Sequence, residues 1–259
     1  MRVRGSSLRR GTIFVLAAFP LTFISLAGCR ARETSFTSPR DAAHALENCT
    51  ADSCSQLTAS LHLSIPLRPK VCSVGTLVGT FEPNSTDALL KVQCSQDFAL
   101  ILLTRDSRGR WRCTDSLSFV FGAHDAINTS LQKLIDLNEE DVVIHGDTVT
   151  FGAGIGQSDF LVVRASDRKF HTVLDTVEKG TVAVEADEPV VEQQSSFDIT
   201  PATASAPGGV KEVMTLSVGG TKVVVQRDFN WQKDLRIFEP GFWYSSDATL
   251  EGKGKKKSG

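Results

Sequence analysis

The sequence predicts a mainly β protein, built from antiparallel hairpins or meanders that form a sandwich or a propeller-like array, with one or two short helices. From Leu61 onward, short apolar runs alternate with clusters of turn residues at intervals of about eight to twelve residues, which is typical of antiparallel sheets. The apolar fraction of 41% is compatible with a packed core and argues against general disorder.

Twelve strands are expected from these apolar runs. They are Val71–Phe81, Ala88–Gln93, Ala99–Thr104, Trp111–Phe121, Val142–His145, Thr148–Phe151, Phe160–Arg164, Phe170–Asp175, Thr181–Glu185, Val213–Val218, Lys222–Gln226 and Leu235–Phe238. His145-Gly146-Asp147 and Gly219-Gly220 have the composition of tight hairpin turns.

Two helices are predicted. Ser38 is suited to cap a helix and Pro39 to occupy its first position, so we expect a short helix that ends at about Glu47. Between Asp125 and Leu137 the apolar residues recur at helical spacing, which predicts a helix packed on a sheet. These apolar residues are Ile127, Leu131, Leu134 and Ile135.

A weak internal repeat joins an apolar strand, a charged turn and an aromatic residue. Leu100–Trp111 resembles Phe160–Phe170, and Val223–Trp231 is a fainter third copy. Repeated hairpins of this kind occur in β-propellers and in stacked meanders. Any protein rich in hairpins also repeats this order of residues, so both interpretations stay open.

The domain boundaries follow from changes in composition. Residues 39–250 form the predicted β domain, preceded by a polar tether at 29–38 and followed by a basic, flexible tail at 251–259. Gln193–Gly209 is rich in Ser, Thr, Ala, Pro and Gly, which predicts a long loop or a linker. A loop is favoured, because the short strands after it bury little surface alone.

The N-terminal segment has the parts of an export signal. Four arginines in the first ten residues precede an apolar run that ends at Leu26. That run is shorter than the roughly 20 residues that a membrane-spanning helix needs. It ends in Leu26-Ala27-Gly28-Cys29, which resembles the lipobox of bacterial lipoproteins. An ordinary signal peptide with an incidental cysteine is the alternative.

The resemblance to bacterial lipoproteins implies cleavage after residue 28 and acylation of Cys29. Two or three acyl chains hold a soluble domain on a membrane without a protein span. Arg30 follows the cysteine where an inner-membrane retention signal would have Asp. The resemblance therefore implies a cell-envelope protein, anchored in the outer membrane and facing the periplasm or the cell surface.

The remaining cysteines suggest two disulfides, as expected in an oxidising compartment. Cys49 and Cys54 are close enough to bridge locally, and a hairpin around Glu82–Ser85 would place Cys72 opposite Cys94. The second bridge would contribute about 3 kcal/mol. Cys113 is then left over. A redox function for Cys49 and Cys54 is disfavoured because their spacing is not Cys-x-x-Cys.

No catalytic constellation, cofactor motif or metal-ligand spacing emerges from the sequence. The five histidines are scattered, and no nucleophile elbow or zinc-ligand pattern is present. The formal net charge is −2, and loss of the arginine-rich signal would make the chain more acidic, which disfavours nucleic acid as a partner. Contact with a surface is one possible role of Trp243, Tyr244, Lys253, Lys255, Lys256 and Lys257.

These observations favour a lipid-anchored envelope protein whose role is non-catalytic binding, scaffolding or assembly. Its partners would be the membrane and an envelope protein or glycan. Two alternatives stay open. A secreted hydrolase or glycan-processing enzyme would have a pocket with two close carboxylates, or with a histidine, a carboxylate and a nucleophile. A propeller-like spacer would have a symmetric set of blades.

Overall fold

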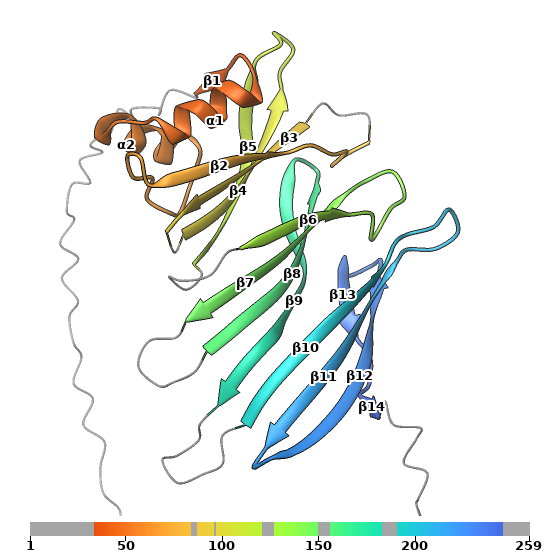
Figure 1. Cartoon of the computed structure of the whole chain (residues 1–259). Helices are drawn as coiled ribbons and strands as arrows, with labels where there is room; N and C mark the ends of the chain where they lie inside the picture. Colours follow the sequence, from red (N-terminus) through yellow and green to blue (C-terminus); the bar gives the residue numbers. More distant parts are fainter. Residues whose placement is uncertain are drawn as a thin grey trace, which may run out of the picture. The chain divides into compact units, whose positions relative to one another are not determined.

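Two antiparallel sheets and two short helices make up the described part of the chain (Figure 1). The computed structural model describes residues 34–83, 87–95, 97–120, 127–149, 156–182 and 191–245. All of them belong to one compact unit, Ala31–Gly259. The mainly β, antiparallel fold class that the sequence predicts is confirmed.

The smaller sheet has five strands in the order β1-β5-β4-β3-β2. These strands are β1 (Ser35–Phe36), β2 (Cys72–Leu77), β3 (Asp87–Cys94), β4 (Asp97–Arg105) and β5 (Trp111–Val120). The predicted tether is therefore partly structured, because Ser35 and Phe36 pair with Arg112 and Trp111 of β5.

The larger sheet has nine strands, eight of which follow the order β13-β12-β11-β10-β9-β8-β7-β6, with β14 paired to β12. These strands are β6 (Asn128–Gln132), β7 (Asp141–Val149), β8 (Gly156–Ser166), β9 (Lys169–Val182), β10 (Val191–Thr200), β11 (Gly209–Val218), β12 (Thr221–Gln232), β13 (Ile237–Pro240) and β14 (Tyr244–Ser245).

Both helices lie near the start of the domain. Helix α1 (Pro39–Glu47) begins as predicted, since the Ser38 side chain accepts a hydrogen bond from the Asp41 N–H. Helix α2 (Ala51–Ser60) was not predicted from the sequence. Thr50 and Ser53 form a capping box at its first turn.

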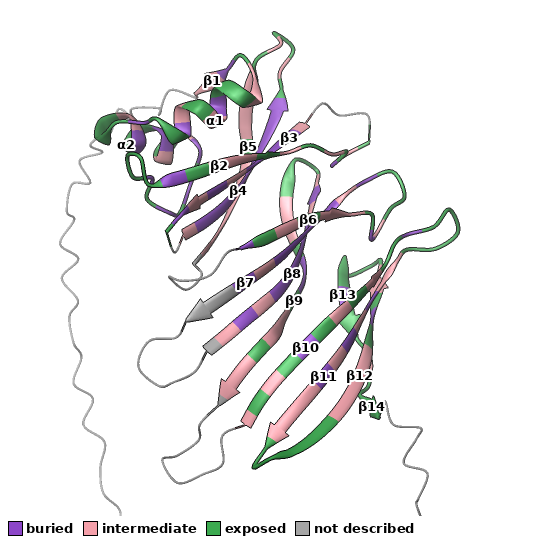
Figure 2. Ribbon diagram, viewed as in Figure 1, coloured by how far each residue is buried: buried purple, intermediate pink, exposed green. Residues whose placement is uncertain are grey.

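Strand β4, at the centre of the small sheet, is buried on both faces, which explains its continuous apolar run Phe98–Leu103. Leu90 and Ile101 face the two helices. They share a core with Leu46 of α1 and Leu57 of α2. On the opposite face, Leu102 joins a second core with residues of the large sheet. Figure 2 shows buried residues concentrated on β3, β4 and β8. The two sheets therefore stack as in a sandwich, rather than as blades of a propeller.

The far face of the large sheet holds a third core. Val143, Phe160 and Val162, on the strands that also pack on the small sheet, meet Val210 and Phe229 from β11 and β12. The Phe160 ring stacks on Phe197 of β10 with centroids 4.0 Å apart. The large sheet thus curls so that its second half packs over its first.

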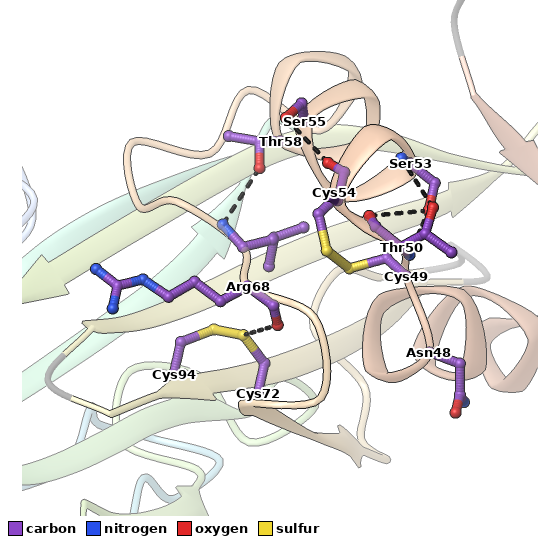
Figure 3. Close-up of a disulfide and its surroundings, with 12 residues drawn as sticks. Asn48, Cys49, Thr50, Ser53, Cys54, Ser55, Thr58, Arg68, Cys72 and Cys94 are labelled. Atoms are coloured by element: carbon purple, nitrogen blue, oxygen red, sulfur yellow. Dashed lines mark hydrogen bonds between the residues drawn. A yellow bond between two sulfur atoms is a disulfide. The ribbon is translucent and has the colours of Figure 1, made fainter.

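The two predicted disulfides are present, and Figure 3 shows them beside helix α2 and the β2–β3 pair. Cys72 lies directly opposite Cys94 in the β2–β3 ladder, as the hairpin prediction requires. Cys49 and Cys54 bridge the first turn of α2. All four contribute to the helix-side core, which indicates a structural role.

The helix predicted at Asp125–Leu137 is wrong wherever the structure describes it. Residues 128–132 form strand β6, and Leu134 and Ile135 lie in the following connection. The four apolar residues recur at helical spacing because they pack in two different cores. Ile127 and Leu131 pack in the core between the sheets, whereas Leu134 and Ile135 pack in the third core.

Some strands are longer than the sequence predicts. His145-Gly146-Asp147 is not a turn but the middle of β7, because these residues pair in register with Phe160, Asp159 and Ser158 of β8. Likewise, the two strands predicted at Phe170–Asp175 and Thr181–Glu185 belong to one strand, β9, as far as Val182, and residues 183–185 lie outside the described residues. The turn at Gly219-Gly220 is confirmed, with both glycines at positive φ.

The segment Gln193–Gly209 is neither a linker nor one long loop. Its first part, through Thr200, lies in β10 and pairs with β11. The loop itself is tied down, because the Ala202 and Gly208 N–H groups donate to the carbonyls of Lys133 and Leu134. A Cβ at Gly208 would lie 2.1 Å from the Thr200 carbonyl oxygen, so this turn requires glycine.

Two of the three predicted repeat copies have equivalent structures. Leu100–Trp111 spans the β4–β5 hairpin, and Phe160–Phe170 spans the β8–β9 hairpin. The third copy, Val223–Trp231, lies entirely within β12 and forms no hairpin. The repeat therefore reflects hairpin chemistry rather than a repeated structural unit.

Candidate functional site: a cleft beside Arg164 and an exposed aromatic edge

A cleft of ≈ 790 Å³ opens where several connections of the large sheet meet. Its walls come from the β6–β7 connection, the β8–β9 and β12–β13 turns, and Pro207 of the tied loop. Glu82 and Pro83, which precede β3, complete the rim. This size is within the range of sites that hold small ligands.

Arg164 on β8 lies in the wall of this cleft between two carboxylates. Its Nη1 donates to Asp141 Oδ1 at 3.1 Å, and its Nη2 pairs with Glu139 Oε2. The other Asp141 oxygen accepts hydrogen bonds from the N–H groups of Leu134 and Ile135 at 3.2 and 3.1 Å. The Arg164 side chain is 14% exposed, and that of Asp141 is fully buried.

Burial dominates the electrostatics of this cluster. It raises the pKa of the Asp141 carboxyl to about 7, although the two backbone N–H donors oppose the rise. The same burial lowers the pKa of Arg164 from its usual value. Because a single guanidinium contacts both Glu139 and Asp141, the cluster has an excess of carboxylate groups.

His171 stands beside this cluster, since it is directly opposite Arg164 in the β8–β9 ladder. Its Nε2 atom is buried and has no hydrogen-bond partner among the described residues. Buried polar atoms normally have a partner, so this ring nitrogen is an exception among the residues that line the cleft.

Trp231 and Arg236 also line the cleft. Trp231 of β12 packs edge-on against Phe238, with ring centroids 5.3 Å apart. At the rim, Arg236 forms an exposed ion pair with Asp167 at 3.2 Å, which joins the β12–β13 and β8–β9 turns. The cleft is thus lined by one tryptophan, by five acidic residues and by three basic ones. The acidic residues are Glu82, Asp136, Glu139, Asp167 and Asp234, and the basic ones are Arg164, Lys233 and Arg236.

Sequence analysis did not identify this cleft. Glu139, Arg164, His171 and Trp231 are far apart in the chain, and none belongs to a recognisable motif. Two turns and a connection bring them together. The only local signal was the aromatic residue that follows each charged turn, and that signal concerns hairpins rather than a site.

The aromatic residues singled out in the sequence lie at the end of the large sheet. Phe242, Trp243 and Tyr244 have exposed fractions of 96%, 40% and 41%. Arg227 lies 4.2 Å from the Trp243 ring centroid, and the Tyr244 hydroxyl donates to Asp228 at 2.9 Å. We call Phe242, Trp243 and Tyr244 the aromatic edge.

Arg227 itself is held firmly in place. Its Nε donates to Glu212 Oε2 at 2.8 Å, and the other Glu212 oxygen accepts a hydrogen bond from Ser195 at 2.6 Å. Glu212 is fully buried. The guanidinium that contacts Trp243 is therefore itself held in position by a buried carboxylate.

The remaining predicted site residues fall into two groups. Cys29, Lys253, Lys255, Lys256 and Lys257 lie outside the described residues. Cys113 is free and half-buried, and burial raises the pKa of its thiol to about 12. This thiol is therefore protonated at neutral pH and poorly suited to nucleophilic chemistry.

No group of three or more histidine, cysteine or acidic side chains among the described residues is arranged to hold a metal ion. Neither described helix has the length and apolar character to cross a membrane.

No protein-family model matches this sequence, and comparisons with curated proteins and with solved structures found no similar protein.

Proposed function

We propose that this protein is a lipid-anchored binding module of the cell envelope, and that its cleft binds a saccharide without cleaving it. The observation that carries the proposal is the make-up of the cleft. Trp231 lines the cleft together with Arg164, Glu139, Asp167 and Arg236, whose polar groups can donate to and accept from hydroxyls.

The charges of the cleft disfavour an anionic ligand, because five carboxyl groups and only three basic side chains line it. Glu139 pairs with Arg164 and Asp167 pairs with Arg236, so part of this charge is compensated within the protein. A saccharide offers apolar C–H faces to Trp231 and hydroxyls to the polar wall. An indole supplies that kind of contact, with an apolar body and a polar edge.

The two carboxylates that hold Arg164 are poorly placed for hydrolysis. Glycoside hydrolysis uses two carboxyl groups that flank the scissile bond from separate positions. Here Glu139 and Asp141 both hold Arg164, and Asp141 is fully buried behind it. This arrangement favours binding over the alternative of a glycan-processing enzyme.

Membrane attachment rests on Leu26-Ala27-Gly28-Cys29. We expect mass spectrometry of the protein from its native source to find an acylated N-terminal Cys29, and Cys29→Ala to move the protein from the membrane fraction to the soluble fraction. An unmodified Cys29 in the wild-type protein would overturn the anchor.

Saccharide binding is tested with the unit Ala31–Gly259, which contains all three cores and both disulfides. We expect calorimetric titration with soluble oligosaccharides of N-acetylglucosamine and of neutral hexoses to give saturable binding to at least one. Trp231→Ala should weaken that binding at least tenfold, or about 1.4 kcal/mol.

Trp111→Phe is the matched control, because Trp111 lies on β5 of the other sheet. It should leave the affinity unchanged. Absence of saturable binding across the panel, or equal effects of the two tryptophan variants, would overturn the saccharide assignment. Chromatography of the same mixtures tests the alternative, since shortened oligosaccharides that disappear with Glu139→Gln would identify an enzyme.

A further inference from the structure

A second pocket, of ≈ 430 Å³, lies where the turns of the two equivalent hairpins meet. The β4–β5 hairpin supplies Arg105 and Arg112 to its lining, and the β8–β9 turn supplies Arg168. None of these three arginines lines the saccharide cleft. We call this the arginine pocket, and it is where the charged turns of the two repeat copies come together.

The arginine pocket has an excess of positive charge. Asp106 is the one acidic residue among the described residues that line it. Its Oδ1 atom accepts hydrogen bonds from the N–H groups of Arg108 and Arg110, each at 2.9 Å, and its Oδ2 atom pairs with Arg112 Nε at 3.0 Å. Both carboxylate oxygens are therefore engaged by the turn itself and by Arg112, which leaves the charges of the other two arginines in the pocket uncompensated by Asp106.

Those two arginines are held by contacts that leave most of each guanidinium available. Arg105 Nε donates to the Gly109 carbonyl at 3.2 Å, which positions the side chain and uses only one of its donors. The backbone N–H of Arg168 donates to Glu82, and this bond fixes the β8–β9 turn. Neither guanidinium forms an ion pair with an acidic residue in the described part of the chain.

This combination suits an oxyanion. Guanidinium groups that line one pocket repel each other, and a bound anion would relieve that repulsion. The planar donor fork of arginine matches the oxygens of phosphate, and the hydroxyls of Ser60, Ser107 and Thr114 in the lining can donate as well. A phosphate monoester carries nearly two negative charges at neutral pH, so it compensates two arginines better than a carboxylate does. The pocket also has room for more than the phosphate group itself.

We propose that the arginine pocket binds the phosphate group of a phosphate ester, with Arg105 and Arg168 as the donors to its oxygens. The ester is either a soluble compound or a lipid headgroup, because both present the same group to the arginines. This site is separate from the saccharide cleft, and it requires neither a bound saccharide nor acylation of Cys29.

Calorimetric titration of the unit Ala31–Gly259 tests the proposal, with glycerol 3-phosphate and inorganic phosphate as the probes. We expect saturable binding of both, weaker binding of acetate and no binding of glycerol. Raising the NaCl concentration from 0.1 to 0.5 M should weaken the association, because salt screens exposed charges.

Two variants locate the site. Arg105→Gln and Arg168→Gln should each weaken binding of glycerol 3-phosphate by about fivefold or more, because each removes charged donors to the phosphate. Arg108→Gln is the matched control, since Arg108 is exposed in the same β4–β5 turn but does not line the pocket. It should leave the affinity nearly unchanged. Far-UV circular dichroism checks that each variant is folded.

Flotation with vesicles that contain phosphatidic acid distinguishes the two sources of the phosphate. Flotation that Arg168→Gln weakens and Arg108→Gln does not would identify a lipid headgroup. Binding of glycerol 3-phosphate without flotation would identify a soluble ester.

Absence of saturable binding by both phosphate compounds would overturn the arginine pocket as a phosphate site. Acetate binding as tight as phosphate binding, or equal losses in Arg108→Gln and Arg168→Gln, would overturn it as well. These outcomes are independent of the function proposed for the cleft, because no saccharide is present and Trp231 is unchanged.

Discussion

At the scale of single residues, Arg164 is the side chain on which the cleft most depends. It is mostly buried and contacts two carboxylates, one of them fully buried. Burying charges is costly, and loss of one partner leaves the others uncompensated. Arg236, which also lines the cleft, forms its ion pair in solvent and carries little of that penalty.

We therefore expect Arg164→Ala to lower the free energy of unfolding by about 3–5 kcal/mol. Arg236→Ala, the matched control, should cost no more than about 1 kcal/mol. Urea unfolding of the two variants measures the difference. Similar costs for the two variants would show that removal of Arg164 does not leave an uncompensated buried charge.

Asp141 predicts a particular pH dependence. Its folded pKa, about 7, lies above the ordinary value of 3.8, so the folded state binds the proton more tightly than the unfolded state. The resulting stabilisation is fully present below about pH 4 and is lost as the pH rises through 7. The expected loss is about 1 kcal/mol per pH unit within that interval.

Asp141→Asn removes the titrating group. The free energy of unfolding of this variant should fall less steeply than that of the wild type between pH 4.5 and 7.5, as measured by urea unfolding at several pH values. Parallel profiles for the two proteins would contradict a raised pKa at Asp141.

At the scale of elements, the disulfides differ in the length of chain that they close. Cys72–Cys94 spans a separation of 22 residues and pins the β2–β3 pair, whereas Cys49–Cys54 spans only 5. In the chain-entropy model, closing a longer loop removes more freedom from the unfolded state.

Removal of each bridge should show this difference. The double variant Cys72→Ala/Cys94→Ala should lose about 3 kcal/mol, and Cys49→Ala/Cys54→Ala about 2 kcal/mol. Urea unfolding under non-reducing conditions gives both values. A larger cost for the short loop would indicate that packing of its sulfurs in the helix-side core outweighs loop entropy.

At the scale of the whole molecule, the core between the sheets couples the two halves of the domain. Leu89, Phe98 and Leu102 from the small sheet share it with Ile144 and Leu161 from the large sheet. Hydrogen bonds to side chains add to this coupling. The Thr80 N–H donates to the Glu140 carboxylate between connections of the two sheets, and the Phe170 N–H of β9 donates to the Asp115 carboxylate of β5.

Leu102→Ala should therefore destabilise both sheets together, by about 2–5 kcal/mol, because it leaves a cavity in the shared core. Far-UV circular dichroism and tryptophan fluorescence should report one common urea midpoint, shifted equally. Val78→Ala, at an exposed position, should change stability by less than about 0.5 kcal/mol. Two separate transitions, with only one shifted, would mean that the sheets unfold independently.

The sequence alone determined those features that depend on neighbours in the chain. Apolar runs that alternate with turn residues indicated an antiparallel β protein. Ser38 and Pro39 indicated the start of α1, and the equal spacing of Cys72 and Cys94 about Glu82–Ser85 indicated their bridge. Each follows from local backbone preference or loop geometry, which act over a few residues.

The remaining features were decided by the tertiary structure alone, because these features depend on which surfaces from distant parts of the chain meet. Ile127 and Leu134 suggest one helical face, yet two different cores bury them from extended or irregular chain. His145–Asp147 has the composition of a turn but stays extended, since pairing with β8 satisfies its backbone. The cleft likewise exists only because the curled sheet brings Arg164, His171 and Trp231 together.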